Sequence, residues 1–113
     1  NQHVYLIVSG KLVTDSPCVT GCVKNGHGTP DGLYSVTYKE SPSVLRGEDY
    51  ETKVNFWMPF NRGIGLHDAT WRDEFGGDIY YSGGSHGCVN LPYQKAAVIY
   101  ENIYAGMPVI CYY

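Results

Sequence analysis

The chain has 113 residues, with eight Lys and Arg against eleven Asp and Glu, which gives a net charge of -3 and a pI near 5.7. This length fits a single domain, and the acidic balance excludes the basic surface that nucleic acids and anionic lipids require. No apolar run reaches the roughly 18 residues of a membrane span, and no charged-then-apolar leader is present.

Residues 1–113 are therefore expected to form one domain that contacts neither nucleic acid nor membrane. The strand-like alternation begins at the first residues, Asn1-Gln2-His3-Val4. This abrupt start indicates a domain taken from a longer protein, and an anchor or export signal could lie upstream.

Short strand-like runs separated by Gly, Pro, Asn and Ser dominate the chain, which is typical of an all-β domain. Strands are predicted at residues 3–9, 11–15, 17–23, 33–39, 50–58, 64–67 and 109–113. The first two form a hairpin that turns at Ser9-Gly10. Residues 24–31 are rich in turn formers, and residues 40–49 read as a polar surface loop.

One good helix candidate spans residues 92–104, where Ala96, Ile99 and Ile103 fall on one face. The segment from Asp68 to Gly84 is long for a loop in so small a domain, and such loops are usually functional or disordered. Its aromatic residues argue against disorder. The sequence thus predicts a mainly β fold with a functional loop between two strands.

Cys88 lies in the run Ser85-His86-Gly87-Cys88-Val89-Asn90, and a second histidine, His67, precedes the long loop. A thiol becomes a useful nucleophile when an imidazole takes its proton, and Gly87 leaves the approach to the sulfur open. In an extended segment His86 and Cys88 share one face. These residue types predict cysteine acyl transfer through an acyl-enzyme.

A zinc site built from His67, His86 and Cys88 is the main inorganic alternative. The short paired spacings typical of zinc ligands are absent, so we expect no metal and no cofactor. A free Cys88 leaves three other cysteines, which are Cys18, Cys22 and Cys111. We expect each to be a small buried apolar residue, with a bridge from Cys18 or Cys22 to Cys111 left open.

These residues resemble the signature of the L,D-transpeptidase (YkuD) family, which is a histidine, a segment of about seventeen residues, Ser/Thr-His-Gly-Cys, a hydrophobic residue and Asn. Here seventeen residues separate His67 from Ser85, Val89 fills the hydrophobic position and Asn90 the last. Further similarity lies in Thr29-Pro30-Asp31-Gly32, in residues 55–60 and in residues 67–71. The resemblance covers nearly the whole chain. It implies a β-sandwich or half-open barrel with one or two flanking helices.

The resemblance implies a role for each motif residue. Cys88 is the nucleophile, and His67 is its base, oriented by the backbone carbonyl of Asp68. His86 has a secondary place near the sulfur. The N–H groups of Gly87 and Cys88 are expected to bind the oxyanion.

Other residues are expected to hold the motif or to contact substrate. Ser85 and Asn90 hold the turn beside the sulfur. Trp71 and Tyr81, together with Trp57 or Met58, are expected to form the wall of a cleft for an extended peptide.

The resemblance also implies the substrate, a peptidoglycan stem peptide that is joined to a second stem in a 3→3 cross-link. Carbapenem β-lactams are the inhibitors it implies, and the cell wall outside the cell is the place of action. Two alternatives remain at this point. One is an L,D-carboxypeptidase that passes the same acyl-enzyme to water, and the other is a wall-binding module without turnover.

Overall fold

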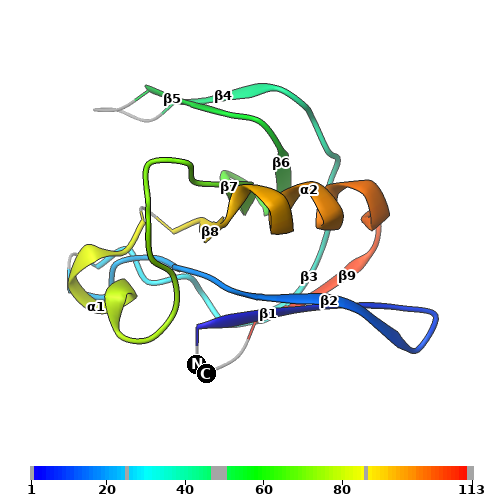
Figure 1. Ribbon diagram of the computed structural model, residues 1–113, viewed down its shortest axis with the longest axis horizontal. Coiled ribbons are helices and arrows are strands. Elements are labelled where there is room, and N and C mark those ends of the chain that lie inside the picture. Colours follow the sequence, from blue (N-terminus) through cyan, green and yellow to red (C-terminus); the bar gives the residue numbers. More distant parts are fainter. Residues whose placement is uncertain (1, 25, 47–50, 86, 112–113) are drawn as a thin grey trace.

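The computed structural model of the chain describes residues 2–24, 26–46, 51–85 and 87–111. Within these ranges the chain forms the strands and helices drawn in Figure 1. The strands are β1 (His3–Val8), β2 (Lys11–Pro17), β3 (Gly32–Ser35), β4 (Ser43–Arg46), β5 (Glu51–Val54), β6 (Trp57–Asn61), β7 (Ile64–Asp68), β8 (Val89–Leu91) and β9 (Pro108–Cys111). The helices are α1 (Ile79–Gly83) and α2 (Tyr93–Asn102). The chain is mainly β with two helices in the described residues, as the sequence predicts.

The predicted hairpin is confirmed as β1 and β2, which pair antiparallel. Its turn residues Ser9 and Gly10 both have positive φ, 53° and 76°, as a type I′ turn requires. Along β1, Leu6 is buried while Tyr5 and Ile7 are exposed, which is the alternation of a strand with one face on the core.

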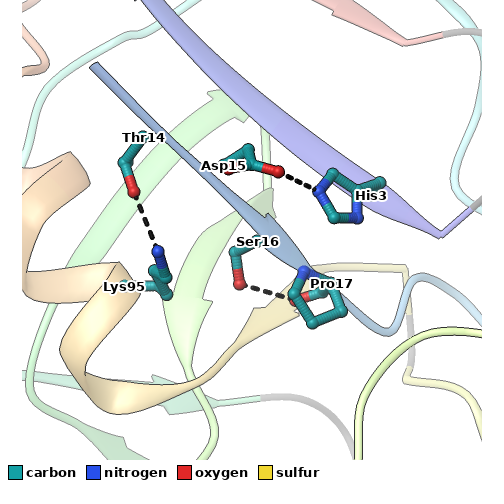
Figure 2. A network of polar contacts seen from close by, with 6 residues as sticks. All are labelled: His3, Thr14, Asp15, Ser16, Pro17 and Lys95. Carbon is teal, nitrogen blue, oxygen red and sulfur yellow. Dashed lines mark hydrogen bonds and ion pairs between the residues drawn. The ribbon is translucent and has the colours of Figure 1, made fainter. Parts of the chain in front are cut away.

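Side-chain contacts add to the hairpin ladder and tie it to α2 (Figure 2). Across the two strands, His3 Nε2 donates to the Asp15 carboxylate at 2.6 Å. From α2, Lys95 Nζ donates to Thr14 Oγ1 at 3.1 Å. The hairpin is thereby held against the rest of the domain through β2.

The three strands β6, β7 and β8 form one sheet, in which β7 lies between an antiparallel and a parallel neighbour. The parallel pairing joins Leu66 to Val89 and His67 to Asn90. Because successive residues of a strand face opposite sides, His67 and Asn90 share one face, and Leu66 and Val89 share the other. Leu66 and Val89 face the hydrophobic core.

The predicted helix is confirmed as α2, which lies beside this sheet (Figure 1). It buries Ala96 and Ile99, and Ile103 is buried directly after its end. The core contains Leu6, Cys18, Val36, Met58, Phe60, Leu66, Val89, Leu91, Ala96, Ile99, Ile103 and Met107. Neither helix in the described ranges is long and apolar enough to cross a bilayer.

The surface loop predicted at residues 40–49 is wrong in part, since Ser43–Arg46 form β4, which pairs with β5. The Arg46 guanidinium and the Glu51 carboxylate make an ion pair across the two strands at 3.1 Å. The β4–β5 hairpin is stabilised by contacts between side chains of the two strands, which cannot be predicted from the polar composition of the segment alone. Residues 47–50 lie outside the described residues.

Other boundaries also differ from the prediction. The single strand expected over residues 50–58 is two strands, β5 and β6. The strand expected over residues 17–23 is absent as a strand, because β2 ends at Pro17 and single bridges follow, from Val19 to Asn90 and from Gly21 to Ser85. The segment expected to be a loop over residues 68–84 contains the short helix α1. The bridges join residues 19 and 21 to the segment around Cys88, and α1 is contacted by Lys24, whose N–H donates to the Tyr81 carbonyl at 2.9 Å. Both differences therefore depend on tertiary contacts.

Gly65 in β7 offers a test of how closely the site strands pack. A Cβ at this position would lie 2.5 Å from Pro59 Cα and 2.6 Å from the Met58 carbonyl oxygen, whereas a Cβ at Gly63 meets nothing within 4 Å. We expect Gly65→Ala to lower the free energy of unfolding by about 3 kcal/mol or more, and Gly63→Ala to change it by less than about 0.5 kcal/mol. Urea denaturation of both variants measures the difference. Equal losses would contradict the close approach of β6 to Gly65.

Candidate active site

The turn that carries Cys88 is held by the side chain of Ser85. Its Oγ donates to the Cys88 carbonyl at 2.5 Å and accepts from the Gly87 N–H at 3.1 Å. Gly87 has a φ of +130°, a conformation that side chains of L-residues rarely adopt. The position therefore requires glycine, and the Ser85 hydroxyl fixes the turn from inside.

Thr29 links this turn to the loop after β2. Its Oγ1 donates to the Gly87 carbonyl at 2.6 Å and accepts from the Gly21 N–H at 2.8 Å. The Thr29 side chain is buried, so these bonds are shielded from water. The threonine of the Thr-Pro-Asp-Gly segment thus positions the turn that presents the cysteine.

Cys88 is half-buried directly before β8, and its Sγ lies 3.4 Å from the Gly63 carbonyl oxygen, to which the thiol donates. Burial raises the pKa of the thiol, and a hydrogen bond from the Gly65 N–H partly offsets that rise. The group is therefore a neutral thiol at neutral pH in the free protein.

His67 is buried at the end of β7, and its Nδ1 lies 2.7 Å from the Asp68 carbonyl oxygen. A carbonyl only accepts, so Nδ1 carries the proton and Nε2 is left with its lone pair. Burial lowers the pKa of His67, and the Arg72 charge lowers it further, while Asp68 acts in the opposite direction. The ring is therefore neutral at neutral pH, with Nε2 able to accept a proton.

Asn90 and Arg72 complete the surroundings of the imidazole. With the Asn90 amide oxygen facing Arg72, that oxygen accepts from Arg72 Nε at 2.9 Å, and Asn90 Nδ2 donates to His67 Nε2 at 3.2 Å. Arg72 also donates to the Gly83 carbonyl at 2.8 Å. Sequence reasoning missed Arg72, although it is the one basic residue within the segment 68–84.

The side-chain carboxylate of Asp68 and its backbone carbonyl bind different partners. The carboxylate is buried and accepts from the N–H groups of Asn55 and Phe56, at 2.8 and 2.9 Å, and from Asn55 Nδ2 at 2.8 Å. These bonds fasten the link between β5 and β6 to the residue that orients His67. Asn55 begins one of the segments of resemblance, but no sequence pattern indicated its contact with Asp68.

Two tryptophans flank the imidazole, with ring centroids 6.1 Å away for Trp57 and 5.9 Å away for Trp71. Trp57 is buried, but Trp71 is 53% exposed. Tyr81, on α1, is also exposed. Trp71 and Tyr81 are thus accessible to a ligand, and Trp71 lies against the predicted base.

Met58 does not have the position expected of a cleft residue. It has no exposed surface and packs in the hydrophobic core, so it cannot contact a substrate in this structure. Asn90 is also fully buried, and its neighbours are His67 and Arg72. Both strands are buried on their two faces, since every residue from Trp57 to Phe60 of β6 and from Val89 to Leu91 of β8 is buried. His86 lies outside the described residues.

The remaining cysteines are free, and Cys18 and Cys22 are buried while Cys111 is half-buried. Burial raises the pKa of Cys18 to about 12, which makes it inert at neutral pH. Among the described residues no group of three or more His, Cys, Asp and Glu side chains could hold a metal ion.

An open hollow lies on the surface beside the His67 side of the site. Its lining consists of Trp71, Arg72, Asp73, Glu74 and Ile79. Asp73 and Glu74 are exposed, so the hollow offers two carboxylates next to an exposed indole ring. The Arg72 guanidinium offsets one of the two carboxylates, so the lining has a net negative charge that attracts a cationic group.

The comparison with known proteins agrees with this geometry. The model of the L,D-transpeptidase catalytic domain family, YkuD, matches residues 1–111. A search of the curated proteins finds no match. A mutant of the Enterococcus faecium L,D-transpeptidase is 35% identical with a TM-score of 0.93, covering 99% of this chain and 46% of that one.

Two further solved structures extend the comparison. The catalytic domain of the E. faecium L,D-transpeptidase acylated by ertapenem is 36% identical with a TM-score of 0.87, covering 99% of this chain and 90% of that one. An L,D-transpeptidase from Mycobacterium smegmatis is 27% identical with a TM-score of 0.81, covering 99% of this chain and 54% of that one.

The fold and the site define a class of protein. Its members are mainly β domains with a cysteine on a glycine turn and a buried histidine on the neighbouring strand. The chain belongs to the YkuD family of L,D-transpeptidase catalytic domains. It spans about half the length, or less, of the E. faecium mutant and M. smegmatis chains.

The three hydrogen bonds of the Asp68 carboxylate lead to a stability prediction. Asp68→Ala removes the acceptor of all three, so we expect it to lower the free energy of unfolding by about 2–3 kcal/mol. Asp68→Asn keeps one oxygen for the two backbone N–H groups, and the Asn55 amide can turn to suit it, so we expect a loss of about 1 kcal/mol. Urea denaturation at neutral pH measures both. If the two variants lose equal stability, the negative charge matters more than the acceptor geometry.

Proposed function

We propose that this domain performs cysteine acyl transfer on peptidoglycan stem peptides and forms 3→3 cross-links. The observation that carries the proposal is the parallel register of β7 and β8. Leu66 pairs with Val89, so the residue opposite Cys88 in this register is Gly65. His67 follows Gly65 by two residues and therefore lies on the same face of the sheet as Cys88. Family membership supports the assignment, and so does the E. faecium relative that ertapenem acylates.

In the proposed reaction, Cys88 Sγ attacks the carbonyl of the third residue of a donor stem, a diamino acid. The C–N bond to the terminal D-alanine breaks, and the amine leaves with a proton from the base. A side-chain amine of an acceptor stem then attacks the thioester and releases the thiol. The site needs one base that first takes and later returns a proton, and His67 Nε2 suits that role.

The protonation states of Cys88 and His67 favour a mechanism in which the proton moves during attack, and they do not favour a preformed thiolate–imidazolium pair. The pKa of Cys88 is raised and that of His67 is lowered, so both are neutral at neutral pH. The thiol must first turn from the Gly63 carbonyl toward the imidazole, and His67 Nε2 must release the Asn90 amide that donates to it. Both are side-chain movements that are fast beside turnover. For His86, which lies outside the described residues, we keep the secondary role that the family resemblance implies.

Oxyanion binding is assigned to the N–H groups of Cys88 and Gly87. Neither hydrogen bond of the Ser85 hydroxyl uses the Cys88 N–H, so this amide is the first donor in the proposal. The Gly87 N–H contacts Ser85 Oγ at 3.1 Å and must release it to bind the oxyanion. Substrate arrival would therefore change the contacts of Ser85.

The acceptor side is proposed to lie over the hollow beside Trp71. A diamino acid side chain is cationic before it reacts, and Asp73 and Glu74 in the hollow suit such a group. This favours transfer to an amine over hydrolysis by water, which is the carboxypeptidase alternative. A wall-binding module without turnover would not need a His67 ring oriented by the Asp68 carbonyl.

Two further statements follow by similarity. A carbapenem is expected to acylate Cys88, as ertapenem acylates the E. faecium domain. The domain is expected to act in the cell wall outside the membrane.

The test is incubation of the domain with a disaccharide-tetrapeptide and identification of products by mass spectrometry. We expect a 3→3 cross-linked dimer and free D-alanine, and we expect Cys88→Ala to lose both products. The matched control Cys111→Ala, which also removes a half-buried thiol, should keep them. A tripeptide without dimer would assign the domain to carboxypeptidase activity. Products from Cys88→Ala would place the nucleophile elsewhere.

The raised pKa of Cys88 gives a pH prediction. Alkylation of Cys88 by iodoacetamide needs only the thiolate, so its rate should still increase with pH at 9.0, the ordinary thiol value. Acylation by ertapenem needs neutral His67, whose pKa lies below 6.5, so its rate should fall only below that pH. Stopped-flow and mass-spectrometric rates measure the two profiles. An alkylation plateau near neutral pH would show a preformed thiolate and contradict the neutral pair.

A further inference from the structure

The side-chain amide of Asn90 lies between the imidazole of His67 and the guanidinium of Arg72. Its oxygen accepts from Arg72 Nε at 2.9 Å and from Arg72 Nη2 at 3.3 Å, while Nδ2 lies 3.2 Å from His67 Nε2. The ring proton of His67 is on Nδ1, against the Asp68 carbonyl, so Nε2 can only accept. This is therefore the one orientation of the amide in which both ends meet a complementary group.

The backbone of Asn90 is fixed on both sides, so the amide has little freedom to leave this position. On one side β8 pairs with β7. On the other, the Asn90 N–H donates to the Val19 carbonyl at 2.8 Å, and the Val19 N–H donates back at 3.0 Å. Asn90 is only 1% exposed, so water does not reach the amide to replace either partner. The orientation of the amide is therefore decided by His67 and Arg72.

Arg72 is anchored by contacts of its own. Its Nη1 donates to the Gly83 carbonyl at 2.8 Å, at the end of α1, and its backbone N–H donates to the Ala69 carbonyl at 3.1 Å. Burial lowers the pKa of Arg72, but a guanidinium keeps its charge at neutral pH. Arg72 is thus held within the loop between β7 and the cysteine turn, where it presents two N–H groups to one buried oxygen.

The direction of the Asn90 amide affects which protonation state of His67 is stable. An N–H group beside Nε2 stabilises the neutral ring, because a proton on Nε2 would have no acceptor there. A turned amide would present its oxygen and would stabilise the imidazolium. Turning would also set the Asn90 NH2 group against the two donors of Arg72. Arg72 therefore opposes the orientation that favours a protonated His67.

The other groups around His67 do not replace this contact. Burial has the largest effect on the pKa of His67 and lowers it, while the charges of Asp68 and Arg72 act in opposite directions. Trp57 from β6 and Trp71 from the loop contribute uncharged rings, and Cys88 is a neutral thiol in the free protein. The Asn90 amide is the hydrogen-bond partner that the described residues offer to Nε2.

We propose that Arg72 is a positioning residue, which fixes the Asn90 amide with its N–H group toward His67 Nε2 and so keeps the base unprotonated until substrate binds. The inference rests on the proposed function for the role of His67 as base. When Cys88 attacks, its proton moves to Nε2, and the new N–H finds no acceptor in the Asn90 amide. The imidazolium is therefore a strong acid, which returns the proton to the nitrogen of the leaving D-alanine.

The test is nuclear magnetic resonance of the ¹⁵N-labelled protein, in which no substrate takes part. A coupling between Asn90 Nδ2 and His67 Nε2 should be present in the unchanged chain, since a hydrogen bond that joins two nitrogens transmits it. The ¹⁵N chemical shifts of the ring, followed between about pH 5 and 8, give the ratio of imidazolium to imidazole. The two readouts report the direction of the amide and its effect on the base separately.

Arg72→Met should remove the coupling and raise that ratio about tenfold at a given pH, the factor that one ordinary hydrogen bond supplies. Arg72→Lys keeps the charge, but one ammonium group cannot reproduce the fork that bonds the Asn90 oxygen and the Gly83 carbonyl together. We expect it to raise the ratio about threefold. The matched control Lys24→Met removes an exposed positive charge and should change neither readout. In each variant the ring of His3, bonded in the β1–β2 hairpin, reports that the fold is kept.

The pH profile of acylation gives a readout that a merely structural role would not move. In Arg72→Met, the rate of acylation by ertapenem should begin to fall at a pH about one unit higher than in the unchanged chain. The loss of rate should be larger at acid pH than at alkaline pH. A loss of equal size at every pH would mean that Arg72 only supports the structure of the loop.

Each other outcome overturns the proposal. An unchanged chain without the coupling would mean that the Asn90 amide has the opposite orientation. An unaltered protonation ratio in Arg72→Met would leave Arg72 without effect on the base. If Arg72→Lys matches the unchanged chain, the charge alone acts and the fork is not needed; this variant also carries the test if Arg72→Met does not fold. Failure of the tetrapeptide assay would overturn the proposed function, whereas the coupling and the ratio report on Arg72 without it, so the two failures are distinguishable.

Discussion

The parallel pairing of β7 with β8 is the constraint on which the site depends. One register sets His67 beside Asn90 and Leu66 beside Val89. A slip of β8 by one residue would turn Asn90 into the core and Val89 toward the site. Fixing this register is therefore equivalent to placing base and nucleophile, and the close approach of β6 to Gly65 packs β7 on its other side.

Around that register, hydrogen bonds set the chemical state of each group. The Asp68 carbonyl fixes the His67 proton on Nδ1, and burial keeps the ring neutral. Burial also keeps Cys88 protonated. The site thus holds a neutral acid and a neutral base, and it avoids the cost of two separated charges in a low dielectric until substrate arrives.

The two faces of the sheet formed by β6, β7 and β8 have different surroundings. On one face, His67 lies between Trp57 and Trp71 and meets Asn90. On the other, Leu66 and Val89 border a cavity that the described residues leave unfilled. Mechanism and packing are therefore coupled through the same few residues, and a change beneath the sheet is expected to reach the site without touching substrate.

The sequence by itself determined the β1–β2 hairpin, the helix α2 and the signature that joins His67 to Cys88, because turn residues, periodicity and motif spacing are local. It did not determine that Met58 is buried, that α1 forms, or that Arg72 contacts Asn90. Those facts depend on which segments meet in space, and a face of a strand becomes core or surface only when its neighbours pack against it. Tertiary structure alone decided them.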